Sequence, residues 1–307
     1  MNNKDFQIVV LAKQVPDTHN VGKDAMKEDG TINRAALPAI FNPDDLKALE
    51  MALACKDALK DIMSVKVTII TMGPSRAAEI IRESMFRGAD NGFVVSDKRF
   101  AGSDTLATSY ALSAAVKKLG KVDIVFSGRQ AIDGDTAQVG PQVAEKLEIP
   151  QITYAEELIS MTEKEIVIKR RLDRGVETVK SSFPVLVTVH GNANDCRPRH
   201  AKLLMTNKKA CSVSEVMERQ QTTDNGQQSL SIEDMEALWA SRPYLKIEEW
   251  SADDINPDFA RLGLSGSPTK VKSIENVVLT SKENKKIDNS ESEINELMKE
   301  LISAHII

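Results

Sequence analysis

Residues 122–140 of this chain read Val-Asp-Ile-Val-Phe-Ser-Gly-Arg-Gln-Ala-Ile-Asp-Gly-Asp-Thr-Ala-Gln-Val-Gly. The apolar start of this stretch, residues 122–127, predicts a short buried strand, and the glycine-containing part after it opens a helical pattern. Open parallel sheets bind ligands at the carboxyl ends of their strands, where free N–H groups and a helix N-terminus hold phosphate. From the residues alone, an ordinary capped strand-to-helix turn explains the stretch equally well.

Strand-like and helix-like segments alternate through the first half of the chain. Residues 6–12, 65–71 and 92–96 are further short β-branched runs, and helical patterns fill the sequence between them. Parallel strands need a crossover connection, which is usually a helix. The alternation therefore predicts an α/β fold with a mostly parallel, Rossmann-like sheet.

The first helix has the clearest start signal in the sequence. Asn42 stands in the capping position and Pro43 in the first helical position. Asp44 and Asp45 follow in the first turn, where negative charge is favourable. We expect Asn42 to cap this helix.

Two more helices are expected in the same half of the chain. They cover residues 75–87 and 103–119, and each is followed by a glycine that stops it. Ser103 and Asp104 are the start signals of the second one, and its spacing places Leu106 in the core.

The pattern changes after residue 150. Three apolar runs, 166–168, 176–179 and 185–189, surround a turn at residues 173–175, and we expect them to pair as an antiparallel hairpin extension of the sheet. Residues 191–209 are rich in Asn, Pro and Arg with little periodicity, which predicts an exposed loop.

Composition excludes several classes of protein. The net charge of -5 and the pI near 5.6 argue against binding nucleic acid by phosphate neutralisation. The start of the chain is too short and too polar for a signal sequence or a membrane span. The three cysteines form no CxxC pair, which suits a reducing compartment, so we expect a cytoplasmic protein.

Other common site signatures are missing from the sequence. The four histidines lack ligand spacing and no cysteine pair stands near them, so we predict no metal. There is also no GxGxxG and no Walker A sequence, which argues against an NAD-type Rossmann fingerprint and a P-loop NTPase.

Residues 128–140 resemble the adenine-nucleotide loop of electron-transfer flavoprotein β subunits. The other segments that resemble this family are 10–16, 42–45, 72–74 and 168–188. The last of them departs from the family pattern at Arg174, where an acidic residue or glycine is preferred. The segments follow one another in the family's order across nearly the whole chain, so the chain is identified as similar to these subunits.

The resemblance implies a nucleotide crevice at the carboxyl ends of the strands and names no catalytic side chain. The cofactor-binding residues that it implies are Leu11, Ala12, Lys13, Asn42, Asp44, Asp45, Met72, Gly73, Thr105, Thr108, Gly128, Arg129, Gln130, Ala131, Asp133, Gly134, Asp135, Thr136, Ala137, Gln138 and Val139.

Within the family, the chain resembles the electron-bifurcating type of anaerobes. The resemblance lies in residues 15–18, the Asp44-Asp45 pair, and residues 100–110 and 263–269. It implies that the crevice holds FAD, which oxidises NADH and splits the electrons between ferredoxin or flavodoxin and the FAD of an α subunit. That second FAD leads to an acyl-CoA or lactate-type dehydrogenase. The alternative is the non-bifurcating carrier, whose β subunit holds structural AMP.

A third possibility is an ATP-using enzyme of the adenine-nucleotide α-hydrolase type. That group needs a Ser-Gly-Gly phosphate loop after its first strand, and this chain has Ala12-Lys13-Gln14 there. The sequence therefore favours an electron carrier subunit, redox-active only within a flavoprotein complex.

Two segments are expected to contact partners. The resemblance implies that residues 191–201 form a recognition loop for the dehydrogenase. We expect one nucleotide-binding domain over residues 1–256 and a C-terminal arm over residues 257–307. The arm ends in a polar stretch followed by Ile294, Leu297, Met298, Leu301 and Ile302 at helical spacing, an apolar stripe that needs a surface to cover it. The stripe could fold back on its own domain, and the family resemblance implies that it docks on the α subunit.

Overall fold

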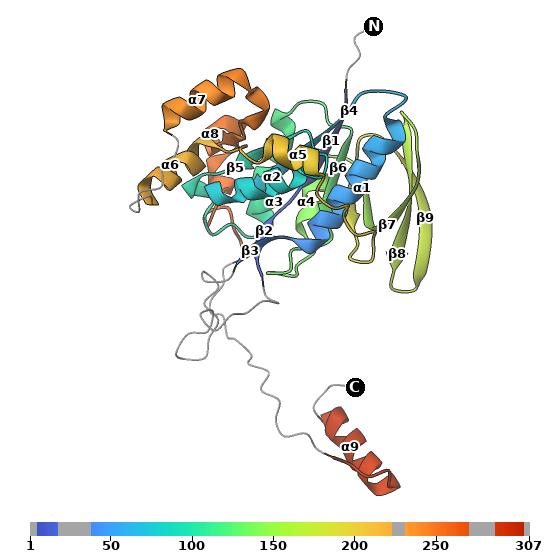
Figure 1. The fold of residues 1–307 in the computed structure, drawn as a ribbon. Coiled ribbons are helices and arrows are strands. Elements are labelled where there is room, and N and C mark those ends of the chain that lie inside the picture. Colours follow the sequence, from blue (N-terminus) through green and yellow to red (C-terminus); the bar gives the residue numbers. More distant parts are fainter. Residues whose placement is uncertain (1–4, 18–37, 223–230, 270–285, 304–307) are drawn as a thin grey trace. The chain divides into compact units, whose positions relative to one another are not determined.

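The computed structural model describes residues 5–17, 38–222, 231–269 and 286–303. The chain divides into two compact units, Met1–Val271 and Lys272–Ile307. The described part of the first unit is built around a mostly parallel nine-stranded sheet with helices packed on it (Figure 1), so the predicted α/β fold is confirmed. Residues 257–269 group with this first unit.

The strand order of the sheet is β11-β5-β4-β1-β6-β10-β7-β8-β9. All neighbouring pairs from β11 to β7 are parallel, and the β7–β8 and β8–β9 pairs are antiparallel. The strands predicted over residues 6–12, 65–71, 92–96 and 122–127 are β1, β4, β5 and β6. The bounds are β1 (Phe6–Leu11), β4 (Val65–Met72), β5 (Asn91–Val95), β6 (Ile124–Gly128), β7 (Gln151–Met161), β8 (Glu165–Leu172), β9 (Gly175–Ser182), β10 (Val185–Val189) and β11 (Glu248–Trp250), and a separate antiparallel pair is β2 (Gln14–Pro16) and β3 (Ala39–Phe41).

The prediction for residues 185–189 was wrong in its pairing. This strand, β10, lies between β6 and β7 and runs parallel to both, instead of joining the antiparallel extension. Every residue of β10 is buried, as expected for a strand covered on both faces. The hairpin itself is formed by β8 and β9, and β7 is a long strand that the sequence analysis missed.

Helices cover both faces of the sheet. The side chains of β1 point alternately to one face and the other. Ile8 and Val10 pack with α1 (Pro43–Leu59) and α2 (Ala78–Met85) on one face. Val9 and Leu11 belong to a second core on the other face. That core contains residues of α3 (Thr105–Lys118), α4 (Val139–Leu147) and α8 (Ala252–Ile255). Successive strand residues face opposite sides, so a parallel sheet buried on both faces needs continuous apolar strands.

The two predicted helices after α1 are shorter than expected. Residues 75–87 form a 3-10 turn, η3 (Ser75–Ala77), followed by α2. α3 starts after Asp104, whose carboxylate accepts the N–H of Ala107 at 3.0 Å. Placing Leu106 in the core was wrong, because its side chain is 39% exposed beside the crevice described below.

Residues 191–209 are less loop-like than predicted. They end in a short helix, α5 (Ala201–Asn207), and Ala193 is buried. The guanidinium group of Arg197 binds the carboxylate of Glu50 and also lies 2.9 Å from that of Asp57, both on α1. The segment is therefore fastened to the domain by its own side chains.

The remaining elements complete the described structure. They are η4 (Lys98–Phe100), α6 (Val213–Thr222), α7 (Ile232–Ser241), η5 (Pro243–Leu245), η6 (Phe259–Arg261) and, in the second unit, α9 (Glu291–Ser303). On α9 the side chains of Ile294, Met298 and Ile302 are exposed. No helix in the described ranges is long and apolar enough to cross a membrane.

Candidate functional site

A crevice lies at the carboxyl ends of β1, β4 and β6, and its cavity measures about 660 Å³. The chain leaves β1 toward β4 on one side and reaches β6 on the other, so the sheet order reverses at β1. Open α/β sheets bind ligands at such a switch point, and this volume falls in the usual range for small-molecule sites.

Asn42 organises the loop after β6. Its side-chain amide donates to the backbone oxygen of Gln130 at 2.8 Å, and its side-chain oxygen accepts the N–H of Ile132 at 3.2 Å. Asn42 occupies the capping position of α1 but makes no side-chain cap bond, so the predicted cap was wrong. The amide is fully buried and used for long-range contacts instead.

Asp45 joins the ends of two strands at the floor of the crevice. Its two carboxylate oxygens accept the N–H groups of Lys13 and Gly128, each at 2.9 Å. Burial raises the pKa of Asp45 to about 7, against the lowering effect of these hydrogen bonds. The side chain is only 6% exposed.

Asp44 lies beside Asp45 and faces the next loop. Burial also raises the pKa of its carboxyl group, while the guanidinium group of Arg129, 3.8 Å away, lowers it. The backbone N–H of Arg129 donates to Val189 at the end of β10 at 2.8 Å. The first turn of α1 thus contacts the ends of β1, β6 and β10.

The loop from residue 131 to 138 has an unusual backbone. Asp135 and Ala137 adopt left-handed conformations, with φ of 49° and 51°. Within the described residues, the N–H groups of Thr136, Ala137 and Gln138 have no acceptor. Adjacent free N–H groups at a helix start are suited to anionic oxygens.

Part of the crevice lining forms an apolar wall. The large apolar side chains of this wall are Leu11, Ile70, Met72, Phe100 and Leu112. At the mouth, the ammonium group of Lys13 forms an ion pair with Asp133 at 2.7 Å, and both side chains are partly exposed. The crevice therefore combines a polar loop, an apolar wall and a charged rim.

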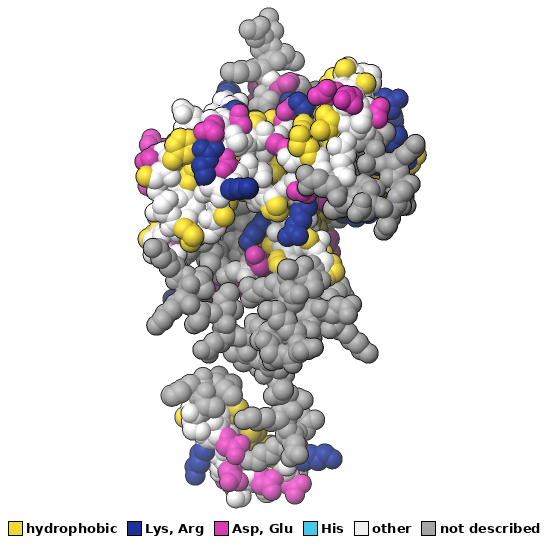
Figure 2. Space-filling view, turned by 90° about the vertical axis from the view of Figure 1, so that its left-hand side faces the viewer, with side chains coloured by type: hydrophobic (Ala, Val, Ile, Leu, Met, Phe, Trp, Pro, Cys, Tyr) yellow, Lys and Arg dark blue, Asp and Glu magenta, His cyan; other side chains and the backbone are white. Residues whose placement is uncertain are grey.

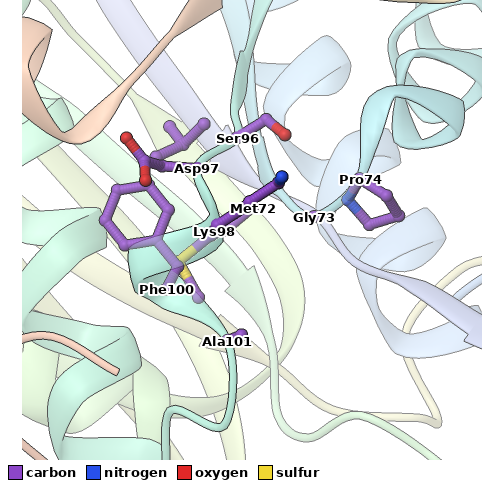
Figure 3. A pocket seen from close by; sticks show the side chains of 9 residues that line it. Met72, Gly73, Pro74, Ser96, Asp97, Lys98, Phe100 and Ala101 are labelled. Carbon is purple, nitrogen blue, oxygen red and sulfur yellow. The ribbon is translucent and has the colours of Figure 1, made fainter. Parts of the chain in front are cut away.

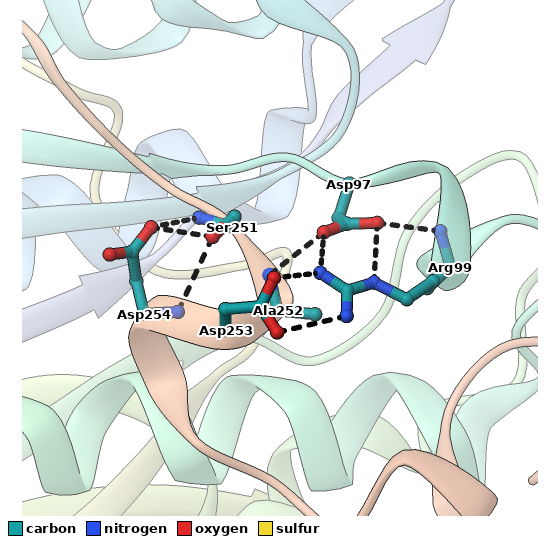
Figure 4. A network of polar contacts seen from close by, with 6 residues as sticks. All are labelled: Asp97, Arg99, Ser251, Ala252, Asp253 and Asp254. Atoms are coloured by element: carbon teal, nitrogen blue, oxygen red, sulfur yellow. Dashed lines mark hydrogen bonds and ion pairs between the residues drawn. The ribbon is translucent and has the colours of Figure 1, made fainter.

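An ion-pair network holds the η4 part of this wall (Figure 4). Arg99 donates to both carboxylate oxygens of Asp97 and to both of Asp253, and Asp97 also accepts the N–H of Ala252. The hydrogen bond from Arg99 holds the pKa of Asp97 well below its usual range. The loop after β5 is thereby fixed to the start of α8.

The segment before residue 270 reaches the same crevice. The N–H of Thr269 donates to Asp104 at 3.0 Å, and the hydroxyl group of Ser267 accepts the N–H of Asp104 at 2.8 Å. Thr269 lines the crevice. Residues distant in sequence thus meet at the start of α3.

The structure brings most of the residues that the resemblance implied into one crevice. Asn42 and Asp44 do not line it and instead support its loops, while Gly73 lines a smaller adjoining pocket. Nucleotide contact by any of them stays a prediction. The predicted residues that line the crevice are Leu11, Ala12, Lys13, Asp45, Met72, Thr105, Thr108, Gly128, Arg129, Gln130, Ala131, Asp133, Gly134, Asp135, Thr136, Ala137, Gln138 and Val139.

Sequence reasoning missed several lining residues. Ser127 had a local signal, because it is the last residue before the glycine that ends β6. Thr269 had a signal only in the family resemblance of residues 263–269, and the fold brings it to the start of α3. The lining residues absent from the prediction are Ile70, Phe100, Gly102, Ser103, Asp104, Leu112, Ser127, Gly140 and Thr269.

The residues present fit an adenine nucleotide or a flavin nucleotide. The hydroxyl group of Ser127 is buried at the crevice without a partner, and free N–H groups are available on the neighbouring loop. The hydroxyl group of Thr105 donates to Gln138 at 2.9 Å, so both polar side chains stand at the same edge. Phosphate and sugar oxygens suit these donors, and a planar ring suits the apolar wall.

Charged side chains are mixed over the face that Figure 2 shows. Acidic and basic groups alternate among the described residues there, without a broad basic area. The net charge of -5 agrees with this mixture. Nothing on that face favours nucleic acid.

Comparisons with known proteins agree with the geometry. The model of the electron transfer flavoprotein domain matches residues 29–218. The electron transfer flavoprotein subunit beta of Megasphaera elsdenii is 38% identical over 98% of this chain and 100% of its own length. Subunit CarD of the caffeyl-CoA reductase-Etf complex of Acetobacterium woodii is 39% identical over 87% and 86%. The acryloyl-CoA reductase electron transfer subunit gamma of Anaerotignum propionicum is 50% identical over 60% and 67%.

The fold and the crevice define an α/β protein with a ligand site at the switch point of a mostly parallel sheet. The family match covers more than half of the chain, and the Megasphaera relative is similar over almost all of it. The chain belongs to the electron transfer flavoprotein family, among the β subunits, and its function is electron transfer.

Proposed function

We propose that this β subunit holds FAD in the crevice and works in a heterodimer with an α subunit that carries a second FAD. The proposed reaction is electron bifurcation: NADH is the electron donor, ferredoxin or flavodoxin receives one electron, and the α-subunit flavin receives the other. The observation that carries the proposal is the extent of the apolar lining, which continues from the crevice through Met72 and Phe100 into an adjoining pocket, because the adenine ring of AMP alone does not need a surface of that length.

A second, smaller pocket extends the apolar wall (Figure 3). It measures about 340 Å³ and lies at the ends of β4 and β5, with Met72 and Phe100 common to both pockets. Gly73 and Ser96 also line it. We infer that this pocket gives the nicotinamide ring of NADH access to the edge of the flavin site.

When bound, a flavin supplies the chemistry that accepts two electrons from a hydride donor and releases them singly. The protein would bind the flavin and orient its ring. The N–H groups of Thr136, Ala137 and Gln138 would hold phosphate oxygens, and the wall with Met72 and Phe100 would exclude water from the ring. No side chain of the chain needs to act as a catalytic acid or base.

The proposed final partner is a dehydrogenase that acts on acyl-CoA compounds, with a lactate-type enzyme as the alternative. Two relatives carry names that refer to CoA-ester reductases, one of caffeyl-CoA and one of acryloyl-CoA. The segment from residue 191 to 201 is the proposed contact. Its fastening to α1 through Arg197 leaves Asn194 and Asp195 exposed for a partner.

Nucleotide extraction tests the bifurcating reading. The αβ complex is purified, denatured in acid and chromatographed, and we expect two FAD and little AMP per heterodimer. NADH should then reduce the flavin of this subunit in a stopped-flow experiment. One FAD and one AMP per heterodimer would contradict the bifurcating reading and favour the non-bifurcating carrier with structural AMP.

A further inference from the structure

Asp45 is a buried acid at the floor of the crevice whose two oxygens face two backbone donors. The N–H of Lys13 lies 2.9 Å from one oxygen, and the N–H of Gly128 lies 2.9 Å from the other. Gly128 is the last residue of β6 and Lys13 follows the end of the neighbouring parallel strand β1, whose Leu11 pairs with Ser127 of β6. One side chain therefore connects the segment after β1 with the end of β6 at the crevice floor.

The geometry leaves little freedom around Asp45. The backbone oxygen of Lys13 accepts the N–H of Asn42 at 3.0 Å. Asn42 and Asp45, at the start of α1, therefore bind both backbone polar groups of Lys13. A Cβ atom at Gly128 would lie 2.5 Å from the Asp45 carboxylate and 2.7 Å from the backbone of Asp44. Glycine is required here because α1 approaches β6 so closely.

Ionised Asp45 is costly for folding. Burial raises its pKa to about 7, which means that the fold favours the neutral carboxyl group below that pH. A neutral amide or an apolar side chain at this position would remove that cost. A carboxylate that lowers stability is explained if the site needs one side chain that accepts two N–H groups at once.

We propose that Asp45 is a positioning residue of the crevice: as a carboxylate it holds the Lys13 and Gly128 peptides at the spacing that a nucleotide requires. The proposal rests on the proposed function, because it needs a nucleotide in this crevice. A carboxylate accepts both N–H groups at once. A protonated carboxyl group turns one oxygen into a donor, so one of the two hydrogen bonds is lost.

The charged groups near the Asp44-Asp45 pair come from α1, the loop after β6 and the segments after β1 and β10. On α1 these are Asp44 and Lys47, and the loop after β6 contributes Arg129. The ammonium group of Lys13 points to Asp133, and His190 at the end of β10 faces Asp44. Among these, the negative charge of Asp44 acts directly on Asp45 and raises its pKa further.

The sign of the pH effect follows from the acceptor role. Above about pH 7 Asp45 is ionised, both N–H groups are held, and nucleotide affinity is highest. As the pH falls through this value, the affinity should decrease. If the negative charge of Asp45 mainly repelled the ligand phosphates, the affinity would change in the opposite direction.

The test uses the full-length chain freed of bound nucleotide, with FAD as the probe, because its phosphates have no ionisation near neutral pH. Dissociation constants are measured by flavin fluorescence between about pH 6 and about pH 8 for the wild type and Asp45→Asn. Asp123→Asn is the matched control. Asp123 is equally buried and accepts the N–H of Gln7 at 2.9 Å, but at the opposite edge of the same two strands.

We expect Asp45→Asn to weaken FAD binding by about tenfold at the higher pH and to remove the pH dependence seen in the wild type. Asp123→Asn should leave the affinity and its pH profile unchanged. Thermal melting reports whether each variant folds. If Asp45→Asn does not fold, the pH dependence of FAD affinity in the wild type tests the inference: a decrease in affinity toward lower pH supports it.

Three results would overturn the inference. The first is unchanged affinity in a folded Asp45→Asn chain, and the second is tighter binding of FAD by the wild type at the lower pH. In both cases the proposed function stands. The third is a wild-type chain that binds neither FAD nor AMP, which removes the proposed function and this inference with it.

Discussion

The side-chain amide of Asn42 donates to the backbone oxygen of Gln130 at 2.8 Å, although the two residues are 88 positions apart. The same side chain accepts the N–H of Ile132. The start of α1 thus determines the conformation of the loop after β6. Asn42, which the sequence marks only as a helix start, therefore supports the loop of the crevice.

Replacing Asn42 by alanine should remove this support. We expect a loss of about 1–3 kcal/mol in unfolding free energy, because two loop backbone groups lose their partner, and weaker nucleotide binding. Chemical denaturation and FAD titration measure both effects. Asn91→Ala is the control, since Asn91 accepts the hydroxyl group of Thr68 at the other edge of the sheet. Equal loss of affinity in the control would contradict the prediction.

Gly134 and Gly128 should respond differently to a side chain. A Cβ atom at Gly134 meets nothing within 4 Å, so Gly134→Val should keep the melting temperature while its side chain blocks the crevice and reduces FAD affinity at least about tenfold. At Gly128 the clash with Asp45 should lower stability by about 1–3 kcal/mol. Similar melting temperatures and similar affinities for both variants would show that the loop does not approach the ligand.

Stability should depend on pH through Asp45. Its pKa is raised to about 7, so its stabilising contribution is full at low pH and is lost as the pH rises through about 7. Between about pH 5.5 and about pH 7 the wild type should lose about 1–2 kcal/mol more unfolding free energy than Asp45→Asn. Urea denaturation at several pH values measures the difference. Parallel curves for the two proteins would assign the pH dependence to other groups.

The C-terminal helix should matter for assembly more than for the folding of the first unit. Helix α9 has 13 residues, a length that is marginal for an isolated helix in water, and it exposes Ile294, Met298 and Ile302. Deleting residues 281–307 should weaken binding to the α subunit, measured by light scattering or titration, and leave the melting temperature nearly unchanged. If the truncated chain melts at a lower temperature but assembles normally, the helix instead stabilises the fold of the β subunit itself.

A full-length variant sharpens this experiment. Serine in place of all three exposed apolar residues should reproduce the loss of α-subunit affinity. Serine at Asn295 and Lys299, which lie between them on the same helix, should have no effect. Loss of affinity in both variants would indicate that helix formation, and not the apolar stripe, is what counts.

The recognition loop should affect the dehydrogenase and not the flavin. Asp195 forms an exposed ion pair with Lys47 at 2.7 Å, which contributes little stability. Alanine at Asn192, Asn194 and Asp195 should reduce electron transfer to the dehydrogenase, while reduction of the flavin by NADH stays unchanged. Asp173→Ala in the exposed β8–β9 turn is the control. Unchanged transfer in the triple variant would remove this loop from the partner surface.

The sequence by itself determined the strands and helices whose signals are local. The apolar runs that became β1, β4, β5 and β6, and the polar loop that follows β6, could be recognised because a buried parallel strand is continuously apolar and loop residues are not. Their alternation also predicted that the loops would meet at one edge.

Only the tertiary structure decided how the side chains at that edge are used. The side chain of Asn42 makes no cap bond and instead binds the backbone of residues 130 and 132, and Asp45 in the first turn of α1 accepts the N–H groups of Lys13 and Gly128. β10 pairs with β6 and β7, two strands that lie elsewhere in the sequence, and local patterns do not specify such pairing. Thr269 likewise reaches the crevice through a contact with the distant Asp104. These outcomes depend on contacts between distant residues, which local propensity does not encode.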